Sequence, residues 1–254
     1  MAQLPASNFK RILLVGDGSA ASENAAWRAG LLAREHGAWL RLLHVGRWHE
    51  DAQAARLQLD ALAWRLQERL QVAVIAQSLR GGLRRELAAA GADLVVTHPS
   101  QHPVRDRITG LHPASLVAGC DVPVLVVRKA AVMSYQRMLA CVREDAQADR
   151  CLAAAARMAD AGLWVKEAPR LVVSSSVEAM LAQERSLYPE LVVVQRGARG
   201  DTRPLALPLW RRLLARTAAD TLLLPPAGAA PAPSVRAGGL APPLGGHGAK
   251  VWPS

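Results

Sequence analysis

One apolar run near the N-terminus constrains the fold of this chain more than any other stretch. Residues 12–15, Ile-Leu-Leu-Val, are followed by the turn sequence Gly-Asp-Gly-Ser at residues 16–19. This pattern is typical of a parallel strand that is covered on both faces and turns tightly into a helix. Serines can cap the first turn of that helix, and Gly37 suits its left-handed end. A second apolar run at residues 40–45 completes a βαβ unit, whose crossover is nearly always right-handed.

Two residues of this unit are candidates for a binding site. Open sheets of this kind bind ligands outside the carboxyl ends of their strands. Asp17 follows the first strand and Val45 ends the second, so both are predicted to lie at that edge. Asp17 is either a ligand-binding residue or a carboxylate that caps the turn into the helix. The sequence leaves both interpretations open.

The alternation of strands and helices continues to about residue 130. Apolar positions spaced by three and four residues predict a long helix over residues 51–70. Further strands are predicted at residues 72–77, 93–96 and 123–128, and further helices at 82–90 and 113–119. Residues 97–103 contain two prolines and are predicted to form a loop. Residues 1–130 therefore form one complete α/β unit with five strands.

Residues 135–226 repeat this order of elements in a reduced form. Strands are predicted at 137–142, 162–166, 171–173, 190–194 and 221–224, and helices at 146–159, 175–186 and 211–217. No helix in this half corresponds to the long one over residues 51–70. Self-similarity along a chain indicates repeated structural units, so two tandem α/β domains are predicted. Residues 227–254 are rich in Ala, Gly and Pro, and we expect a disordered tail there.

Composition argues against a membrane protein and a secreted one. Every apolar run is broken by Arg, Asp, Gly or Pro well short of the ~20 residues that cross a bilayer. The N-terminus has no apolar signal core. The cysteines, Cys120, Cys141 and Cys151, form no CxxC motif and no paired framework, which suits a reducing compartment. We expect a cytoplasmic protein without membrane association.

The formal net charge of +10 raises the question of nucleic-acid binding. The basic residues, however, are spread along the chain. The densest cluster, residues 80–85, is short and has no aromatic side chains on which bases could stack. The pattern favours a solvated basic surface over a nucleic-acid site.

Candidate metal and catalytic residues are few. His98 and His102 are four residues apart, but prolines disfavour a helix there and the sequence places no carboxylate or Cys nearby, so no metal site is predicted. Residues 17–19 lack the G-x-S-x-G elbow that exposes a serine nucleophile. His44 is interpreted as a packed histidine at a strand end. We expect no catalytic residues.

Four motifs of the chain resemble the universal stress protein family. In order they are RILLVGDGSAAS, LRLLHV, ADLVV and PVLVVRK, and they fall within residues 9–129, with a weaker resemblance over residues 135–226. The resemblance implies a Rossmann-like, five-stranded parallel α/β sandwich of the adenine nucleotide alpha hydrolase type, present in two tandem copies. It also implies that the last strands of two domains pack side by side, within this chain or in a homodimer.

Some members of that family bind ATP through a glycine loop after the fourth strand, of the form G-x-x-G, nine residues, then G-S or G-T. Glycines are needed because the backbone must approach the phosphates closely and point its amides at them. Here His98 and Gln101 occupy the two early positions, and Gly110 at the later one is followed by Leu111. The loop is also one residue short. Tight binding of a triphosphate is therefore not expected in the first half.

The second half departs further from this pattern. Residues 197–200 have the G-x-x-G form, but no glycine follows at the required distance. Arg143 or Glu144 stands where Asp17 would be repeated. Nucleotide binding is expected to be absent from this half.

A scaffold that keeps its strands but not its phosphate-binding glycines favours a non-catalytic, regulatory stress-response protein that acts through protein interaction and needs no cofactor. The first alternative is an adenine-nucleotide sensor or slow ATPase that binds ATP through Asp17, Val45 and Gly110. The second alternative is a basic protein associated with nucleic acid.

Overall fold

The computed structural model describes residues 8–46, 51–79, 81–159, 168–197 and 207–226. The strands are β1 (Arg11–Gly16), β2 (Trp39–Val45), β3 (Val74–Leu79), β4 (Leu94–Thr97), β5 (Val124–Val126), β6 (Met138–Val142), β7 (Arg170–Val173), β8 (Leu191–Gln195) and β9 (Asp220–Leu224). The helices are α1 (Ala20–His36), α2 (Ala52–Leu70), α3 (Leu83–Ala89), α4 (Pro103–Thr109), α5 (Pro113–Gly119), α6 (Ala148–Met158), α7 (Val177–Leu187) and α8 (Leu209–Arg216), with a short 3-10 turn, η1 (Asp145–Gln147). None of these described helices has the length and apolar content of a membrane span.

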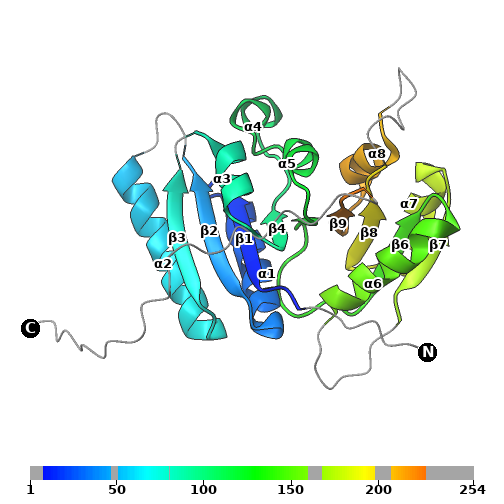
Figure 1. Ribbon diagram of the computed structural model, residues 1–254, viewed down its shortest axis with the longest axis horizontal. Helices are drawn as coiled ribbons and strands as arrows, with labels where there is room; N and C mark the ends of the chain where they lie inside the picture. The colour runs from blue at the N-terminus through cyan, green and yellow to red at the C-terminus, as the bar shows by residue number, and fades with distance from the viewer. Residues whose placement is uncertain (1–7, 47–50, 80, 160–167, 198–206, 227–254) are drawn as a thin grey trace, which may run out of the picture.

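All nine described strands belong to one sheet, in the order β3-β2-β1-β4-β5-β9-β8-β6-β7 (Figure 1). Neighbouring strands are parallel except at the centre, where β5 and β9 are antiparallel and Leu125 lies opposite Leu222. The last strands of the two halves therefore lie side by side. The mixed α/β class predicted from the sequence is confirmed, with one continuous sheet in place of two separate ones.

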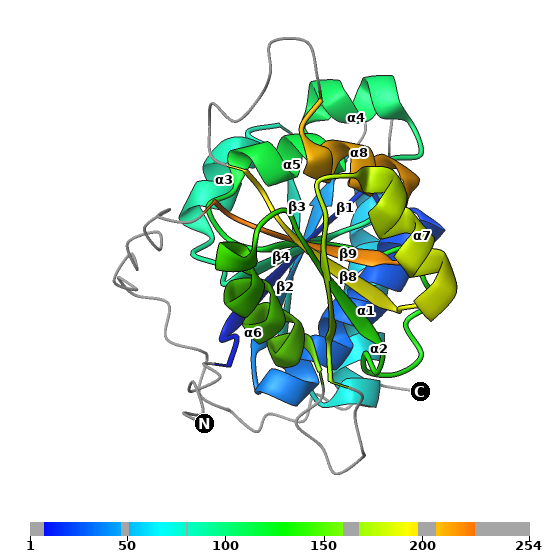
Figure 2. The same ribbon diagram turned by 90° about the vertical axis from the view of Figure 1, so that its right-hand side faces the viewer.

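Helices cover both faces of this sheet (Figure 2). α1, α2 and α6 pack on one face, and α3, α5, α7 and α8 pack on the other. This arrangement follows from right-handed crossovers. A helix that links one strand to a strand nearer the edge of the sheet lies on one face, and a helix that links strands in the opposite direction lies on the other face. Each of the two apolar cores contains residues from both halves of the chain.

The second half differs from its prediction in strand number. The sequence predicts five strands there, whereas the part of the chain that the structure describes holds four, β6 to β9. Residues 162–166, one of the predicted strands, lie outside the described residues. Residues 171–173, predicted as a third strand, pair with β6 and so take the position of a second strand. Strand order depends on pairing partners, which an apolar run alone does not specify.

One hydrogen-bond arrangement recurs in both halves. The Asp93 carboxylate, just before β4, accepts from the backbone amides of Lys10 and Arg11 at 2.8 and 2.9 Å. The Glu190 carboxylate, just before β8, accepts from the backbone amide of Gln136 at 2.7 Å. In each half an acidic residue before a central strand therefore fixes the start of the strand beside it.

A buried carboxylate joins the two halves at the start of β9. Asp220 is fully buried and accepts hydrogen bonds from the Arg128 and Lys129 backbone amides at 2.6 and 2.8 Å. The Tyr135 hydroxyl donates to its other oxygen at 2.6 Å, and the Arg28 guanidinium lies 3.7 Å from the same oxygen. The segment that connects the halves is therefore held against α1 and β9.

Two arginines complete the junction. Arg196, after β8, donates to the backbone oxygens of Val117 and Cys120 at the end of α5, the latter at 2.6 Å. Arg128, after β5, donates to the Leu214 oxygen near the end of α8 at 2.6 Å. Each half thus supplies a cation to the C-terminal carbonyls of the other half's last helix, where helix dipoles favour positive charge.

Candidate functional site at the carboxyl ends of β1 and β4

Asp17 lies where the sequence predicts, in the turn between β1 and α1. Its residue surface is 4% exposed, and the Ser19 backbone amide donates to its Oδ1 at 3.1 Å. Ser19 is the N-cap of α1, because its hydroxyl accepts from the Ser22 amide. Gly18, at φ 76°, makes the turn possible without the strain that a side chain would cause there. The carboxylate of Asp17 is thus fixed at the carboxyl end of β1.

The helix α4 begins at the last residue of the loop predicted over residues 97–103 and runs through a stretch for which no element is predicted. Pro103 occupies its first turn, a position that suits proline because its missing amide proton has no helical acceptor there. The helix places Arg105 over the Asp17 turn, where its guanidinium donates to Asp17 Oδ2 at 2.9 Å. The same guanidinium lies 2.8 Å from Asp106 Oδ1. Arg105 therefore bridges two carboxylates from different elements.

His98 and Ser100 complete this cluster. His98, 4% exposed, places its Nε2 3.3 Å from Asp17 Oδ1 and its Nδ1 2.9 Å from the Pro99 oxygen. The Ser100 hydroxyl donates to Asp106 Oδ2 at 2.6 Å. The expectation that no carboxylate lies near His98 is wrong, because the β1–β4 pairing brings Asp17 to it. We call Asp17, His98, Arg105 and Asp106 the Asp17 cluster.

The electrostatics of the cluster keep both carboxylates ionised. Burial alone would raise the pKa of Asp17, but hydrogen bonds from His98 and Ser19 outweigh it, and the pKa lies well below its ordinary value. Burial also opposes ionisation of Asp106, whose pKa is lowered by Ser100 and Arg105. The pKa of Arg105 is raised, since Asp106 and Asp17 outweigh its partial burial.

The other predicted site residues lie outside the Asp17 cluster. Val45 is 3% exposed and pairs with Leu79 of β3. Gly110 ends α4 in the left-handed conformation, at φ 82°. Leu111 is 5% exposed and belongs to an apolar core. Of the residues that the resemblance assigns to a nucleotide site, only Asp17 lies in the cluster.

Among the described residues, the other candidate metal-binding and nucleophilic side chains do not form a second site. Across the described ranges, no three His, Cys, Asp or Glu side chains gather as a metal site would require. Burial raises the pKa of the Cys120 and Cys151 thiols to about 11 and that of Cys141 to about 12, so all three stay protonated at neutral pH. Arg143 and Glu144, which stand where Asp17 would be repeated, are both exposed.

Comparison with known proteins identifies the first half of the chain. The sequence model of the universal stress protein family matches residues 8–128. No curated protein matches the chain.

Solved structures share the fold over both halves. A protein of unknown function from Pseudomonas aeruginosa PAO1 and a putative universal stress protein from Pseudomonas aeruginosa UCBPP-PA14 each align over 87% of this chain and 94% of their own, at 19% identity and a TM-score of 0.63. A universal stress protein from Archaeoglobus fulgidus DSM 4304 aligns over 86% of this chain and 96% of its own, at 13% identity and a TM-score of 0.56. A universal stress protein domain therefore spans residues 8–128 of this chain.

Proposed function

We propose that this protein is a non-catalytic regulator of stress responses that acts through protein contacts, and that α4 closes the nucleotide crevice of its first half. The observation that carries this proposal is the pair of contacts from Arg105 and His98 to Asp17. Both oxygens of that carboxylate are engaged by the protein itself. A nucleoside would have to displace those contacts to reach Asp17.

Charge at the crevice also opposes a triphosphate. Asp17 and Asp106 contribute two negative charges and Arg105 one positive charge, so these three side chains sum to −1. ATP carries about four negative charges, and phosphate sites in proteins present net positive charge or rows of backbone amides. The glycines that would expose such amides are replaced by His98 and Gln101.

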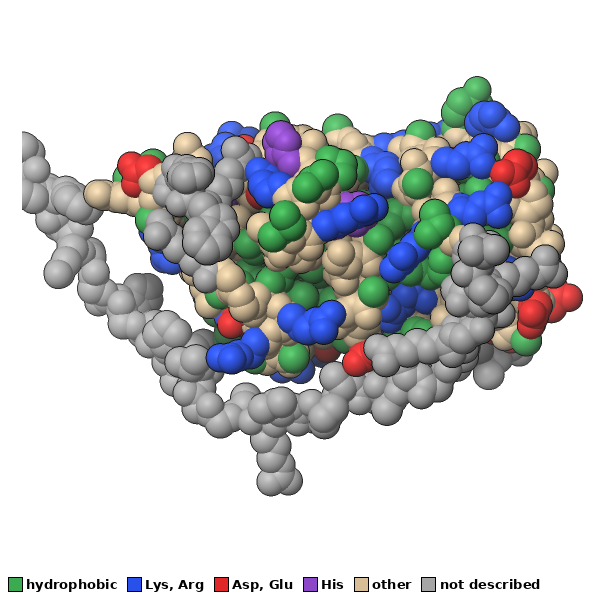
Figure 3. Space-filling view, turned by 90° about the horizontal axis from the view of Figure 1, so that it is seen from above, with side chains coloured by type: hydrophobic (Ala, Val, Ile, Leu, Met, Phe, Trp, Pro, Cys, Tyr) green, Lys and Arg blue, Asp and Glu red, His purple; other side chains and the backbone are tan. Residues whose placement is uncertain are grey.

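Exposed apolar side chains support the interaction role. Val104 and Ile108, four residues apart on α4, are 76% and 81% exposed. They border a hollow that is also lined by Gln101, Pro103 and Thr109. Figure 3 shows hydrophobic side chains mixed with basic ones on the face that carries the carboxyl ends of the first-half strands.

An adenine-nucleotide sensor is the second candidate, and the same arginine favours it. A guanidinium at the carboxyl ends of parallel strands stands where α/β proteins bind phosphates, and arginine binds phosphate through paired hydrogen bonds. In this case Arg105 would leave Asp17 and bind the nucleotide.

The two candidates predict different effects of one substitution. Calorimetric titration with ATP and Mg²⁺ would compare the unaltered chain with Arg105→Ala and with Arg107→Ala, an exposed arginine of the same helix. For a closed crevice, the unaltered chain and Arg107→Ala bind no ATP at micromolar concentrations, and Arg105→Ala binds equally little or better. For a sensor, the unaltered chain binds at micromolar Kd, and Arg105→Ala weakens binding about tenfold or more. Micromolar binding by the unaltered chain would refute the closed crevice.

We also propose that residues 1–130 and 135–226 are tandem copies of one domain, the second reduced. The mirrored strand orders on the two sides of the β5–β9 pair support this, as does the recurrence of the Asp93 arrangement at Glu190. The cytoplasmic location stays a prediction.

A further inference from the structure

The helix α4 has an inward side and an outward side with different surroundings. Its inward side carries Arg105, whose guanidinium bonds to Asp17 and Asp106. Its outward side carries Val104 and Ile108, which are 76% and 81% exposed and border a hollow of about 600 Å³. Full burial of one such aliphatic side chain is worth about 1.5–3 kcal/mol. The outward side therefore suits contact with an apolar surface.

Positive charge lies beside these aliphatic side chains. Arg107 is exposed and directly precedes Ile108 on α4. Burial lowers the pKa of His112, and the charges of Arg107 and of Arg211 on α8 lower it further, so both guanidiniums lie near this histidine. α4 and α8 therefore bring positive charge to the same place, the start of α5.

The helix α3 adds positive charge near the end of α4. Leu83 of α3 lies 3.6 Å from where a Cβ on Gly110 would be, and Gly110 ends α4. Arg84 and Arg85 follow Leu83 and are both exposed. Figure 3 shows basic side chains among the hydrophobic ones on this face of the molecule.

Few carboxylates offset this charge. The helices α3, α4, α5 and α8 together contain two acidic residues, Glu86 and Asp106. Each is already paired, Glu86 with Arg41 of β2 and Asp106 with Arg105. These carboxylates therefore do not compensate the exposed arginines of α3 and α4.

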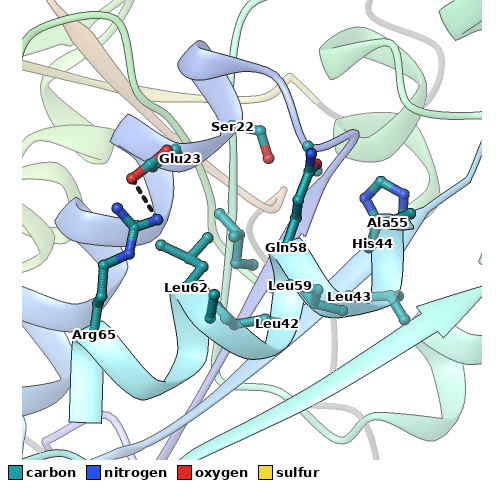
Figure 4. Close-up of a pocket in the computed structure, with 14 residues that line it drawn as sticks. Ser22, Glu23, Leu42, Leu43, His44, Ala55, Gln58, Leu59, Leu62 and Arg65 are labelled. Atoms are coloured by element: carbon teal, nitrogen blue, oxygen red, sulfur yellow. Dashed lines mark ion pairs between the residues drawn. The ribbon is translucent and has the colours of Figure 1, made fainter. Parts of the chain in front are cut away.

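Arginines on the opposite side of the sheet are paired at the surface. Between α1 and α2, Arg65 forms an ion pair with Glu23 at 2.9 Å (Figure 4). On the exposed side of α2, Arg56 pairs with Asp60 at 2.8 Å. Uncompensated positive charge next to exposed aliphatic side chains is thus a property of the α4 side.

We propose that the outward side of α4 is the docking site for an acidic amphipathic segment of a partner protein. Aliphatic side chains of the partner pack on Val104 and Ile108 and enter the hollow, while its carboxylates face Arg107 and the arginines of α3. This inference rests on the proposed role in protein contacts and names the chemistry of the partner. Complementary charge of this kind speeds association and disfavours basic partners.

Other occupants fit the outward side of α4 less well. A second copy of the chain would bring its own arginines against those of the first. Nucleic acid would set phosphates against Val104 and Ile108, which offer neither charge nor a stacking surface. A membrane-binding helix needs a larger apolar face than two aliphatic side chains on a helix of seven residues.

The test uses a fluorescein-labelled peptide of glutamate, alanine and leucine, with the leucines spaced by three and four residues. Its fluorescence anisotropy is followed while the full chain is added at physiological salt. We expect saturable binding with a Kd of about 100 μM or tighter. A peptide of the same composition but without the leucine spacing should bind at least about fivefold more weakly. Equal binding of the two peptides, or none by about 1 mM, would overturn the proposal.

Matched variants locate the binding surface. Ile108→Asp and Arg107→Glu should each weaken peptide binding about tenfold. Leu57→Asp on α2, where the leucine is 63% exposed, and Arg34→Glu at an exposed position of α1 make the same chemical changes on the opposite side of the sheet. Both controls should leave binding unchanged. Equal losses in the α4 variants and in these controls would contradict the assignment to α4.

Two further probes test the class of partner. Vesicles containing phosphatidylserine and a DNA duplex are titrated under the same conditions, and either one binding more tightly than the peptide would overturn a protein partner. The closed crevice is tested separately, by ATP binding to Arg105→Ala. Because Arg107 and Ile108 are exposed whereas Arg105 holds Asp17, either proposal can fail while the other stands.

Discussion

Asp17 shows how a carboxylate stays charged although it is almost fully buried. Burial alone would make ionisation costly, but the Ser19 amide, His98 and Arg105 all approach its oxygens. A carboxylate that accepts from this many donors stabilises the folded state. If the carboxylate is replaced, the donors lose their acceptor and stay buried without a partner. In this structure, the carboxylate that the resemblance assigns to a ligand holds α4 through its hydrogen bond with Arg105.

The contribution of Asp17 to stability should depend on pH. Its pKa is lower in the folded state than in the unfolded chain, so its contribution is complete above the ordinary carboxyl pKa of about 4 and is lost as the pH falls toward the folded value. Asp17→Asn should lower the free energy of unfolding by about 2 kcal/mol at pH 7. Between pH 5 and pH 3 the difference from the unaltered chain should shrink by about 1 kcal/mol.

Urea denaturation at pH 7, 5 and 3 measures this effect. Asp60→Asn is the control, because Asp60 forms an exposed ion pair with Arg56 on α2 and such pairs contribute less than about 1 kcal/mol. A deficit in Asp17→Asn that stays constant across these pH values would show that ionisation of Asp17 plays no part.

At the scale of elements, the short last helix of each half depends on the other half. α5 has seven residues and α8 has eight, lengths at which an isolated helix is not stable in water. Arg196 and Arg128 bond to the C-terminal carbonyls of these helices from across the junction. Tertiary contacts therefore provide the stability that these short helices do not have from their own helix propensity.

Arg196→Ala should destabilise the protein by about 3 kcal/mol, because it removes charge-assisted bonds to two backbone carbonyls at a buried position. Hydrogen exchange should show the largest loss of protection in α5. Arg216→Ala is the control, since Arg216 pairs with exposed Glu178 on the surface and its removal should cost less than about 1 kcal/mol. Equal effects of the two substitutions would mean that Arg196 does not hold α5.

At the scale of the molecule, the two halves share one sheet and both apolar cores. β5 and β9 pair directly, and Leu125 and Leu222 lie opposite each other in the same core. Asp220 adds a buried polar junction beside them. A division of the chain near residue 130 would expose the edge of β5, so we expect both halves to unfold together.

Leu125→Ala tests this cooperation. Leu125 is fully buried, and truncation of such a leucine costs about 2–5 kcal/mol. Native-state hydrogen exchange should show that β1 and β8, one from each half, lose the same amount of protection. A loss confined to the first half would show that the halves unfold separately.

Much of the fold follows from local sequence. The apolar runs at residues 12–15 and 40–45 lie in β1 and β2, and Gly37 ends α1 in the left-handed conformation at φ 60°. These signals are local, because side-chain periodicity and the conformational freedom of glycine act within a few residues. The α/β class of the chain could therefore be predicted from them.

The site could be predicted only in part. The sequence places Asp17 at the end of a strand and shows that His98 and Gln101 replace glycines. It misses α4 because this helix begins only at Pro103, after the predicted loop, and no element is predicted over residues 104–112. Arg105 and Asp17 are 88 positions apart, and no local pattern pairs them.

The sequence by itself determined the strands, the helix α1 and the loss of the glycine loop, since each depends on neighbouring residues. Only the tertiary structure decided that β7 lies beside β6, that β5 and β9 join the halves, and that Arg105 occupies the crevice. These features depend on contacts between distant segments, whose energies arise only when strands pair and side chains are buried together.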